Sequence, residues 1–195
     1  MRSSRAAGFA LLALAAAAVA VGVWVVRSGP GGVGGGRPAL SVTAAPVYLV
    51  AYDAPRFTLS PVDRVVPAPP AAGGDAPADA TPYARALVAA LARGPRAEEA
   101  AAGLASAVPS ATEVRRAERD GDRLRVDLPA AFVAGGGTSS MRARLEQVRW
   151  TLTGAPGIER VTLSVDGAPL EVMGGEGLWV DPTWRRPAGG DLPTW

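Results

Sequence analysis

The stretch TSSMRARLEQVRWTLTGAPGIERVTLSVDG, residues 138–167, decides the fold class because a helical pattern is followed there by a strand pattern. Apolar residues spaced by three or four positions predict a helix that is capped by Thr138 or Ser139 and ends before Pro156. Strict alternation of apolar and polar residues then predicts a strand. The helical stripe consists of Met141, Leu145, Val148 and Leu152, and the inward face of the strand consists of Val161, Leu163 and Val165. Helix and strand therefore both contribute to the domain.

Three arginines lie between the apolar positions of this helix, and the helical period places them away from the stripe. We expect the side chains of Arg142, Arg144 and Arg149 to point to solvent. Because an exposed guanidinium is a ready contact for a partner, Arg142 and Arg149 are candidate interaction residues.

The residues before this stretch alternate between strand and helix signals. Residues 47–52 are apolar on both faces, which predicts an interior strand, whereas residues 59–66 are interrupted by Pro61 and predict an edge strand. Thr81 and Pro82 signal the start of a helix that ends at Gly94. Its apolar stripe consists of Tyr83, Leu87, Val88 and Leu91. A shorter helix is expected from Pro95 to Gly103.

A hairpin is predicted around the Asp-Gly signal at residues 120–121, between strands over 112–117 and 123–128. A two-residue turn would place Arg115 opposite Val126, whereas a three-residue loop would place Val114 there. We favour the second register because it buries the valine.

The whole order of elements is strand, strand, helix, helix, strand, strand, helix, strand, strand. This order predicts an α+β domain in which helices pack on one face of a small mixed sheet. The domain is expected over residues 46–173. Residues 174–195 are expected to form an irregular tail, because prolines and glycines separate its tryptophans.

The N-terminal segment is apolar. Residues 6–26 are 21 positions without a charge, long enough at ~1.5 Å per residue to cross a hydrocarbon core of ~30 Å. We expect a transmembrane anchor, preceded by a cytoplasmic tail at 1–5 and followed by a Gly- and Pro-rich tether at 27–45. The alternative is a signal peptide, cleaved at the small-x-small pattern of residues 18–20. Both interpretations export the domain, and the anchor holds it at the cell membrane.

Composition excludes most catalytic chemistry. The chain has 20 arginines but no cysteine, histidine or lysine, so it builds no Ser-His-Asp triad, thiolate nucleophile, Schiff base, or thiolate or imidazole metal site. We therefore predict no catalytic, cofactor-binding or metal-binding residue. Three carboxylate pairs remain possible in principle, although each lies in a turn or loop where acids are common. They are Asp120 with Asp122, Glu171 with Glu176, and Asp75 with Asp79.

Charge argues against nucleic acid as a partner. Arg2 and Arg5 belong to the N-terminal segment, which leaves 18 arginines against 18 acidic residues in the rest of the chain. A neutral domain has no basic field that would attract phosphates. The tail tryptophans Trp179, Trp184 and Trp195 are better candidates for contact, since exposed aromatics are enriched in interfaces and stack on ligands.

Several short motifs, in this order, resemble the GerMN domain family of sporulation and germination proteins. The motifs are Leu-Ser-Pro-Val-Asp-Arg at 59–64, Ala-Arg-Gly-Pro at 92–95, Gly-Leu to Val-Pro at 103–109, Leu-Arg-Val-Asp-Leu at 124–128, and Thr-Leu to Val-Asp-Gly at 151–167. The resemblance implies an extracytoplasmic, membrane-attached module, similar to ring-building domains of envelope-spanning complexes, without established catalytic residues. This chain has one copy of the domain, and an apolar anchor where lipoprotein relatives use a cysteine.

Three functions are open at this stage. The leading hypothesis is a protein-interaction module that binds an envelope protein or its own copies. The alternative is a cell-wall glycan binder that uses the tail tryptophans, with peptidoglycan as its partner. The third is a carboxylate-dependent hydrolase of wall polymers.

Overall fold

The computed structural model describes residues 41–53, 56–73, 76–174, 177–189 and 192–195. The predicted cytoplasmic tail, the anchor and the tether as far as residue 40 lie outside these residues. Among the residues that are described, no helix combines the length and apolar character that a membrane span requires. The end of the predicted tether already belongs to the first strand, which begins at Val42.

A long antiparallel hairpin opens the domain. It consists of β1 (Val42–Asp53) and β2 (Arg56–Pro67), and β4 (Leu104–Ala105) adds to the other edge of β1. Val47 and Leu49 are fully buried at 0% exposure, which confirms that β1 is an interior strand.

The position of Pro61 confirms that β2 is an edge strand. The main chain of Phe57 hydrogen-bonds outward to Trp195, and the β1–β2 register is regular throughout. The main-chain groups of successive residues in a strand point alternately toward and away from the neighbouring strand. Pro61, four residues after Phe57, therefore also directs its main chain away from β1. A proline at this position therefore removes no ladder hydrogen bond, which is why the strand continues through it.

The second sheet is mixed, with the strand order β11-β7-β6-β5-β3 and with β8 also paired to β7. Its members are β3 (Ala78–Asp79), β5 (Arg116–Asp120), β6 (Arg123–Leu128), β7 (Arg160–Val165), β8 (Ala168–Pro169) and β11 (Thr183–Arg185). Strands β6 and β7 run parallel. A separate small sheet pairs β9 (Val172–Met173) with β10 (Leu178–Trp179). The predicted α+β class is confirmed, but the expectation of one small sheet is wrong.

The β5–β6 hairpin has a register that the sequence did not suggest. Asp120 pairs with Arg123, so the turn is formed by Gly121 and Asp122, and Ala117 lies opposite Val126. Both registers considered from the sequence are therefore wrong. Gly121 has φ 60°, the left-handed conformation that this tight turn requires. Val114 is still buried, at 2% exposure, although it precedes the strand.

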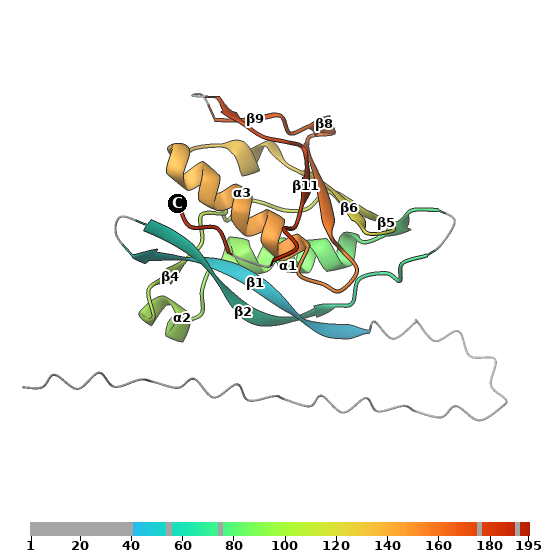
Figure 1. The fold of residues 1–195 in the computed structure, drawn as a ribbon, viewed down its shortest axis with the longest axis horizontal. Helices are drawn as coiled ribbons and strands as arrows, with labels where there is room; N and C mark the ends of the chain where they lie inside the picture. The colour runs from blue at the N-terminus through green and yellow to red at the C-terminus, as the bar shows by residue number, and fades with distance from the viewer. Residues whose placement is uncertain (1–40, 54–55, 74–75, 175–176, 190–191) are drawn as a thin grey trace, which may run out of the picture. The chain divides into compact units, whose positions relative to one another are not determined.

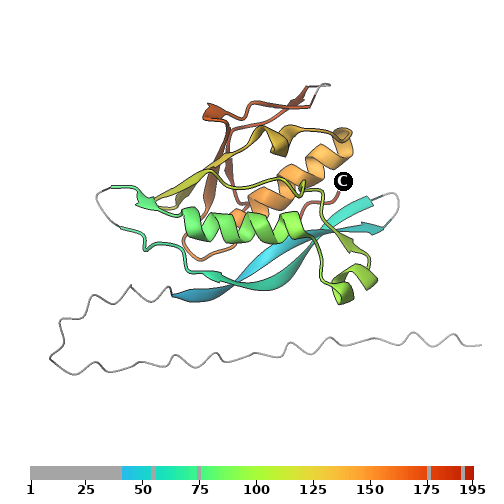
Figure 2. The ribbon, with the colours of Figure 1, turned by 180° about the vertical axis from the view of Figure 1, so that it is seen from behind.

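Two long helices form the centre of the domain (Figures 1 and 2). Helix α1 (Thr81–Arg93) packs against β1, β2 and β5, and α3 (Thr138–Leu152) packs against α1 and β1. The helices therefore do not lie on one face of a single sheet. The short α2 (Ala97–Ala101) and the 3-10 helix Ala130–Val133 lie in connections. The predicted apolar stripe of α1 is buried, as are all four predicted stripe residues of α3.

Helix α3 is buried on more than its predicted face. Ala143 and Trp150 belong to a second apolar cluster with Tyr48, Val50 and Leu59 of the β1–β2 hairpin. Arg144 and Arg149 are consequently buried, at 4% and 7% exposure, and the expectation that they point to solvent is wrong. Arg142 is exposed, as predicted.

Candidate aromatic pocket at the C-terminal segment

The predicted irregular tail is folded onto the domain. We call residues 181–189 and 192–195 the C-terminal segment. Its strand β11 pairs with β7, and further along the Trp195 main chain exchanges hydrogen bonds of 2.8 and 3.2 Å with Phe57 of β2. The Trp195 ring stacks near the Phe57 ring, with the ring centroids 6.3 Å apart. Both ends of the described chain are therefore joined to the same sheet, since Phe57 lies in the opening hairpin.

Arg186 fastens this segment to α3. Its Nη2 donates a 2.6 Å hydrogen bond to the main-chain oxygen of Trp150, and its Nε donates to Thr153 Oγ1 at 3.1 Å. The guanidinium carbon lies 4.4 Å from the Trp150 ring centroid and 5.4 Å from that of Tyr48. A cation over aromatic faces is attracted by the ring quadrupoles, most strongly where water is excluded.

Arg149 has a structural position rather than a surface one. Its Nη2 donates to the main-chain oxygen of Asp181 at 2.7 Å, and its guanidinium lies 5.9 Å from the Trp184 ring centroid. Burial lowers the pKa of Arg149 from its ordinary value, and the nearby carboxylate of Glu146, at 3.4 Å, acts in the opposite direction. This candidate interaction residue therefore holds Trp184 and the C-terminal segment in place.

A cavity of about 330 Å³, the aromatic pocket, lies between α3 and the C-terminal segment. Trp184 is half-buried here, and its ring lies 5.7 Å from the ring of Trp150. The lining residues are Arg142, Glu146, Trp150, Trp184, Pro187, Pro193, Thr194 and Trp195. Two of the predicted tail tryptophans are thus brought together with the predicted Arg142. Trp150 was not predicted as a pocket residue, because an aromatic side chain in a packed helix is typical of a hydrophobic core.

Two polar groups of the pocket walls lack a hydrogen-bond partner within the described part of the chain. They are the indole nitrogens of Trp150 and Trp195, both covered from solvent. A covered donor without an acceptor is destabilising by about 1–3 kcal/mol. The packing of Trp195 on α3 is therefore less favourable than its apolar contacts alone would make it.

Trp179 lies elsewhere and does not line the aromatic pocket. It is 82% exposed on β10, directly opposite Val172 of β9, which is 43% exposed. The adjacent pair on the turn side of the hairpin, Met173 and Leu178, packs against the domain. The β9–β10 hairpin therefore presents an aromatic side chain to solvent while its neighbouring residues are packed against the domain.

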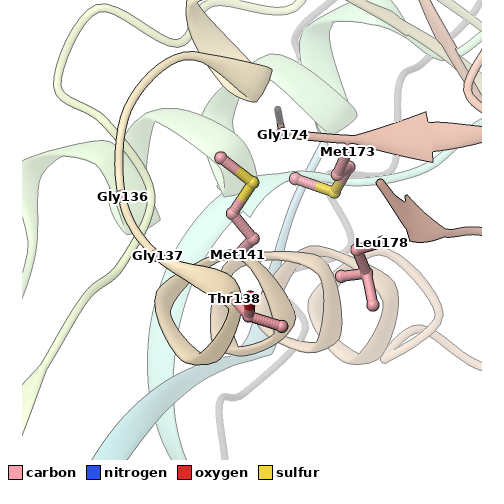
Figure 3. Close-up of a pocket in the computed structure, with 7 residues that line it drawn as sticks. All are labelled: Gly136, Gly137, Thr138, Met141, Met173, Gly174 and Leu178. Atoms are coloured by element: carbon pink, nitrogen blue, oxygen red, sulfur yellow. The ribbon is translucent and has the colours of Figure 1, made fainter. Parts of the chain in front are cut away.

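Two other hollows adjoin α3. Figure 3 shows one of about 140 Å³, where Met141 of α3 and Met173 of β9 approach each other. Gly174 closes it tightly, because a Cβ there would lie 2.6 Å from the Met141 sulfur. The other is a shallow groove of about 540 Å³ that includes Val50, Phe57 and Ala143. Of the described residues that line these two hollows, none is charged.

The carboxylate pairs do not form a catalytic arrangement among the described residues. Asp120 pairs with Arg125 at 2.8 Å, and Asp122 pairs with Arg160. The hydrogen bond from Arg160 lowers the pKa of Asp122 from its ordinary value, so this carboxyl stays ionised. Asp75 and Glu176, members of the other two pairs, lie outside the described residues. No group of three or more potential metal-ligating side chains occurs in the part of the chain that the structure covers.

Residues in the family motifs have structural contacts. Arg64 forms a bidentate pair with Glu99 of α2, with hydrogen bonds of 2.8 and 2.6 Å. Asp127 accepts hydrogen bonds from the Ser164 hydroxyl at 2.7 Å and from the Gly167 main chain at 2.9 Å. These contacts join β2 to α2 and β6 to the turn after β7, so they explain the motifs without a ligand.

The fold and its surface define a small α+β module, with an aromatic pocket and an exposed aromatic hairpin as its distinctive features. The family model Germane, described as sporulation and spore germination, matches residues 46–171, so the chain belongs to the GerMN family. The predicted resemblance is confirmed. No curated protein matches.

Two solved structures from Bacillus subtilis share the fold. The tandem GerMN domains of the sporulation protein GerM are 19% identical with a TM-score of 0.55, and the match covers 79% of this chain and 48% of that one. The first GerMN domain alone is 20% identical with a TM-score of 0.51, and covers 74% of this chain and 98% of that one. This chain spans about half the length of the tandem structure.

Proposed function

We propose that this chain is a membrane-tethered, extracytoplasmic GerMN module that joins a protein assembly of the bacterial cell envelope without catalysing a reaction. Membership of the GerMN family and the apolar segment at residues 6–26 support the location. The ion-paired carboxylates support a binding role over a hydrolytic one. Assembly into a ring, which the family resemblance implies, is the more specific form of this proposal.

The observation that carries the proposal is the exposed pair Trp179 and Val172 on the β9–β10 hairpin. A large aromatic residue that remains 82% exposed on an ordered strand has the character of an interface anchor. The pair follows the region matched by the family model, so it gives this chain a contact surface beyond the shared domain.

Photo-crosslinking in the native membrane tests this proposal. A photoreactive amino acid placed at Trp179 is expected to give adducts of higher mass, because the side chain would lie in the interface. The matched control is the same amino acid at Tyr52, which is 61% exposed at the far end of β1. Recovery of monomer alone from both positions would contradict the proposal.

The location can be tested separately because the chain has no cysteine. A single cysteine at Ala71, an exposed loop position, is expected to react in intact cells with a maleimide that does not cross membranes. Reaction only after cell lysis would place the domain in the cytoplasm and contradict the extracytoplasmic proposal.

A second candidate function, cell-wall glycan binding, is favoured by the aromatic pocket. Trp184 and Trp195 both line it, as a glycan site built from the tail tryptophans requires. Co-sedimentation with purified peptidoglycan is expected to decrease in Trp195→Ala and to be unchanged in Trp179→Ala, since Trp179 lies outside the pocket. Equal sedimentation of both variants with the parent chain would remove this candidate.

A further inference from the structure

We infer that the aromatic pocket binds a glycan that carries a carboxylate, and that Arg142 is the residue that recognises this group. The inference rests on the second candidate function, glycan binding, and adds the chemical class of the sugar. It depends on three features of the pocket: an uncompensated cation, aromatic walls, and few main-chain groups that a peptide could use.

The charge of the pocket favours an anion. Arg142 and Glu146 are one helical turn apart, a spacing that often gives an ion pair. Glu146 instead pairs with Arg149 at 3.4 Å, and the two side chains are only 17% and 9% exposed. No hydrogen bond or ion pair is formed by Arg142 with any residue that the structure describes. Among the side chains of this wall, one positive charge, that of Arg142, therefore remains after Glu146 is neutralised by Arg149.

A guanidinium is suited to a carboxylate because its planar N–H groups match the two oxygens in a bidentate geometry. The exposure of Arg142 leaves its side chain accessible to a ligand in the pocket. A carboxylate bound there would complete a pairing that the protein itself leaves open.

The walls suit a sugar ring. Trp184 and Trp195, which are partly exposed, supply aromatic surface on which the C–H faces of a sugar pack. The pocket size falls within the range of small-ligand sites. The carboxylate of Glu146 and the hydroxyl of Thr194 are additional hydrogen-bonding groups for ring hydroxyls.

An extended peptide would find fewer complementary groups. The main-chain N–H and C=O of Trp195 are already paired with Phe57, and Pro187 and Pro193 have no main-chain N–H. Recognition in this pocket therefore depends on side chains, as is usual for a ligand with hydroxyl and carboxylate groups, rather than on strand pairing.

Two disaccharides of similar size test the inference. N-acetylglucosaminyl-N-acetylmuramic acid carries a carboxylate, whereas di-N-acetylchitobiose does not. Titration of the full chain, in a detergent without a sugar headgroup, is followed by calorimetry and tryptophan fluorescence. We expect the acidic disaccharide to bind more tightly. Arg142→Gln should weaken its binding roughly tenfold and leave the neutral sugar unaffected. Arg116→Gln, an exposed arginine on β5, is the matched control.

The possible results separate the inference from the function on which it rests. Equal binding of both sugars, or acidic binding that Arg142→Gln does not change, would overturn the carboxylate inference and leave glycan binding intact. Absence of binding by either sugar would overturn both. Fluorescence changes with a proline-rich peptide but with neither sugar would identify a peptide site and also overturn the inference.

Discussion

The guanidinium of Arg186 lies 4.4 Å from the centre of the Trp150 ring and donates a hydrogen bond to the main-chain oxygen of the same residue. One side chain thus holds both the ring and the backbone at the end of α3. Because Arg186 follows β11 directly, the contact also fixes the path of the C-terminal segment past Tyr48.

Replacement of Arg186 by alanine is expected to lower the free energy of unfolding by about 2 kcal/mol, through lost cation–π contact and hydrogen bonds. Urea unfolding monitored by tryptophan fluorescence measures the change. Arg185→Ala is the control, because its side chain is 63% exposed and its ion pairs are on the surface. Similar unfolding curves for the two variants would show that the Arg186 contacts add little.

Replacement of Arg144 by methionine is expected to destabilise the protein by roughly 3 kcal/mol. Arg144 donates to the main-chain oxygens of Ala107, Phe132, Ala134 and Gly135 at 2.6 to 3.1 Å. Lysine should not restore stability, because an ammonium cannot reproduce the planar fork that reaches these acceptors. Arg142→Met, on the exposed side of the same helix, should change unfolding by less than about 0.5 kcal/mol. Equal effects at both positions would contradict the burial of Arg144.

Replacement of Gln147 by leucine is expected to lower the free energy of unfolding by about 2 to 4 kcal/mol. The Gln147 side chain accepts a hydrogen bond from the Ala107 N–H at 2.7 Å and donates one to the main-chain oxygen of Tyr48 at 3.0 Å. Leucine removes the partner of both main-chain groups, of which the Tyr48 oxygen is buried and the Ala107 N–H is partly buried. Ser139→Ala, an exposed change in the first turn of α3, is the control in thermal unfolding. Unfolding temperatures that agree for the two variants would count against this role.

Stability should depend on pH through Glu99. The hydrogen bonds from Arg64 lower the pKa of Glu99 from 4.5 to about 2. The folded state therefore binds this proton less readily than the unfolded chain, so the stabilisation is complete above pH 4.5 and is lost as pH falls toward 2. The difference in unfolding free energy between the parent chain and Glu99→Gln should shrink over this range. In an Arg64→Met background the same comparison should depend less on pH, because only the Arg96 main-chain hydrogen bond at 2.8 Å and the Arg96 charge remain to lower the Glu99 pKa. A pH dependence as large as in the parent chain would assign the effect to another group.

Elements with a clear apolar period could be predicted from the sequence. The buried stripe of α1 and the strand β7 follow directly from spacing, because each presents one face to the core. The edge position of β2 could also be predicted, since Pro61 is compatible with few other places in a sheet.

Helical periodicity did not predict the burial of two arginines of α3. Arg144 and Arg149 lie off the stripe of α3, which for a surface helix means solvent. Here Trp150 and the C-terminal segment cover that second side, and main-chain oxygens from distant loops surround the guanidinium groups. Such acceptors belong to the tertiary structure and leave no periodic signal.

The register of the β5–β6 hairpin and the path of the C-terminal segment could not be predicted, for local reasons. Gly121 and Asp122 form the turn in place of the more familiar Asp-Gly pair, and a small Ala117 rather than a valine fills the position opposite Val126. The tail has no period because single contacts, such as Trp195 with Phe57, hold it in place. The aromatic pocket depends on that fold-back, so only its individual residues could be proposed in advance.

The placement of β1 determines the order in which the domain can close. Its Tyr48 N–H donates to Thr151 Oγ1, which is 103 positions further along the chain, and its Tyr48 hydroxyl meets Arg186, 138 positions away. Because the chain is synthesised from its N-terminus, β1 cannot form these contacts until the last segments of the domain have been made. The domain therefore completes its tertiary contacts late, after almost its whole length has been synthesised.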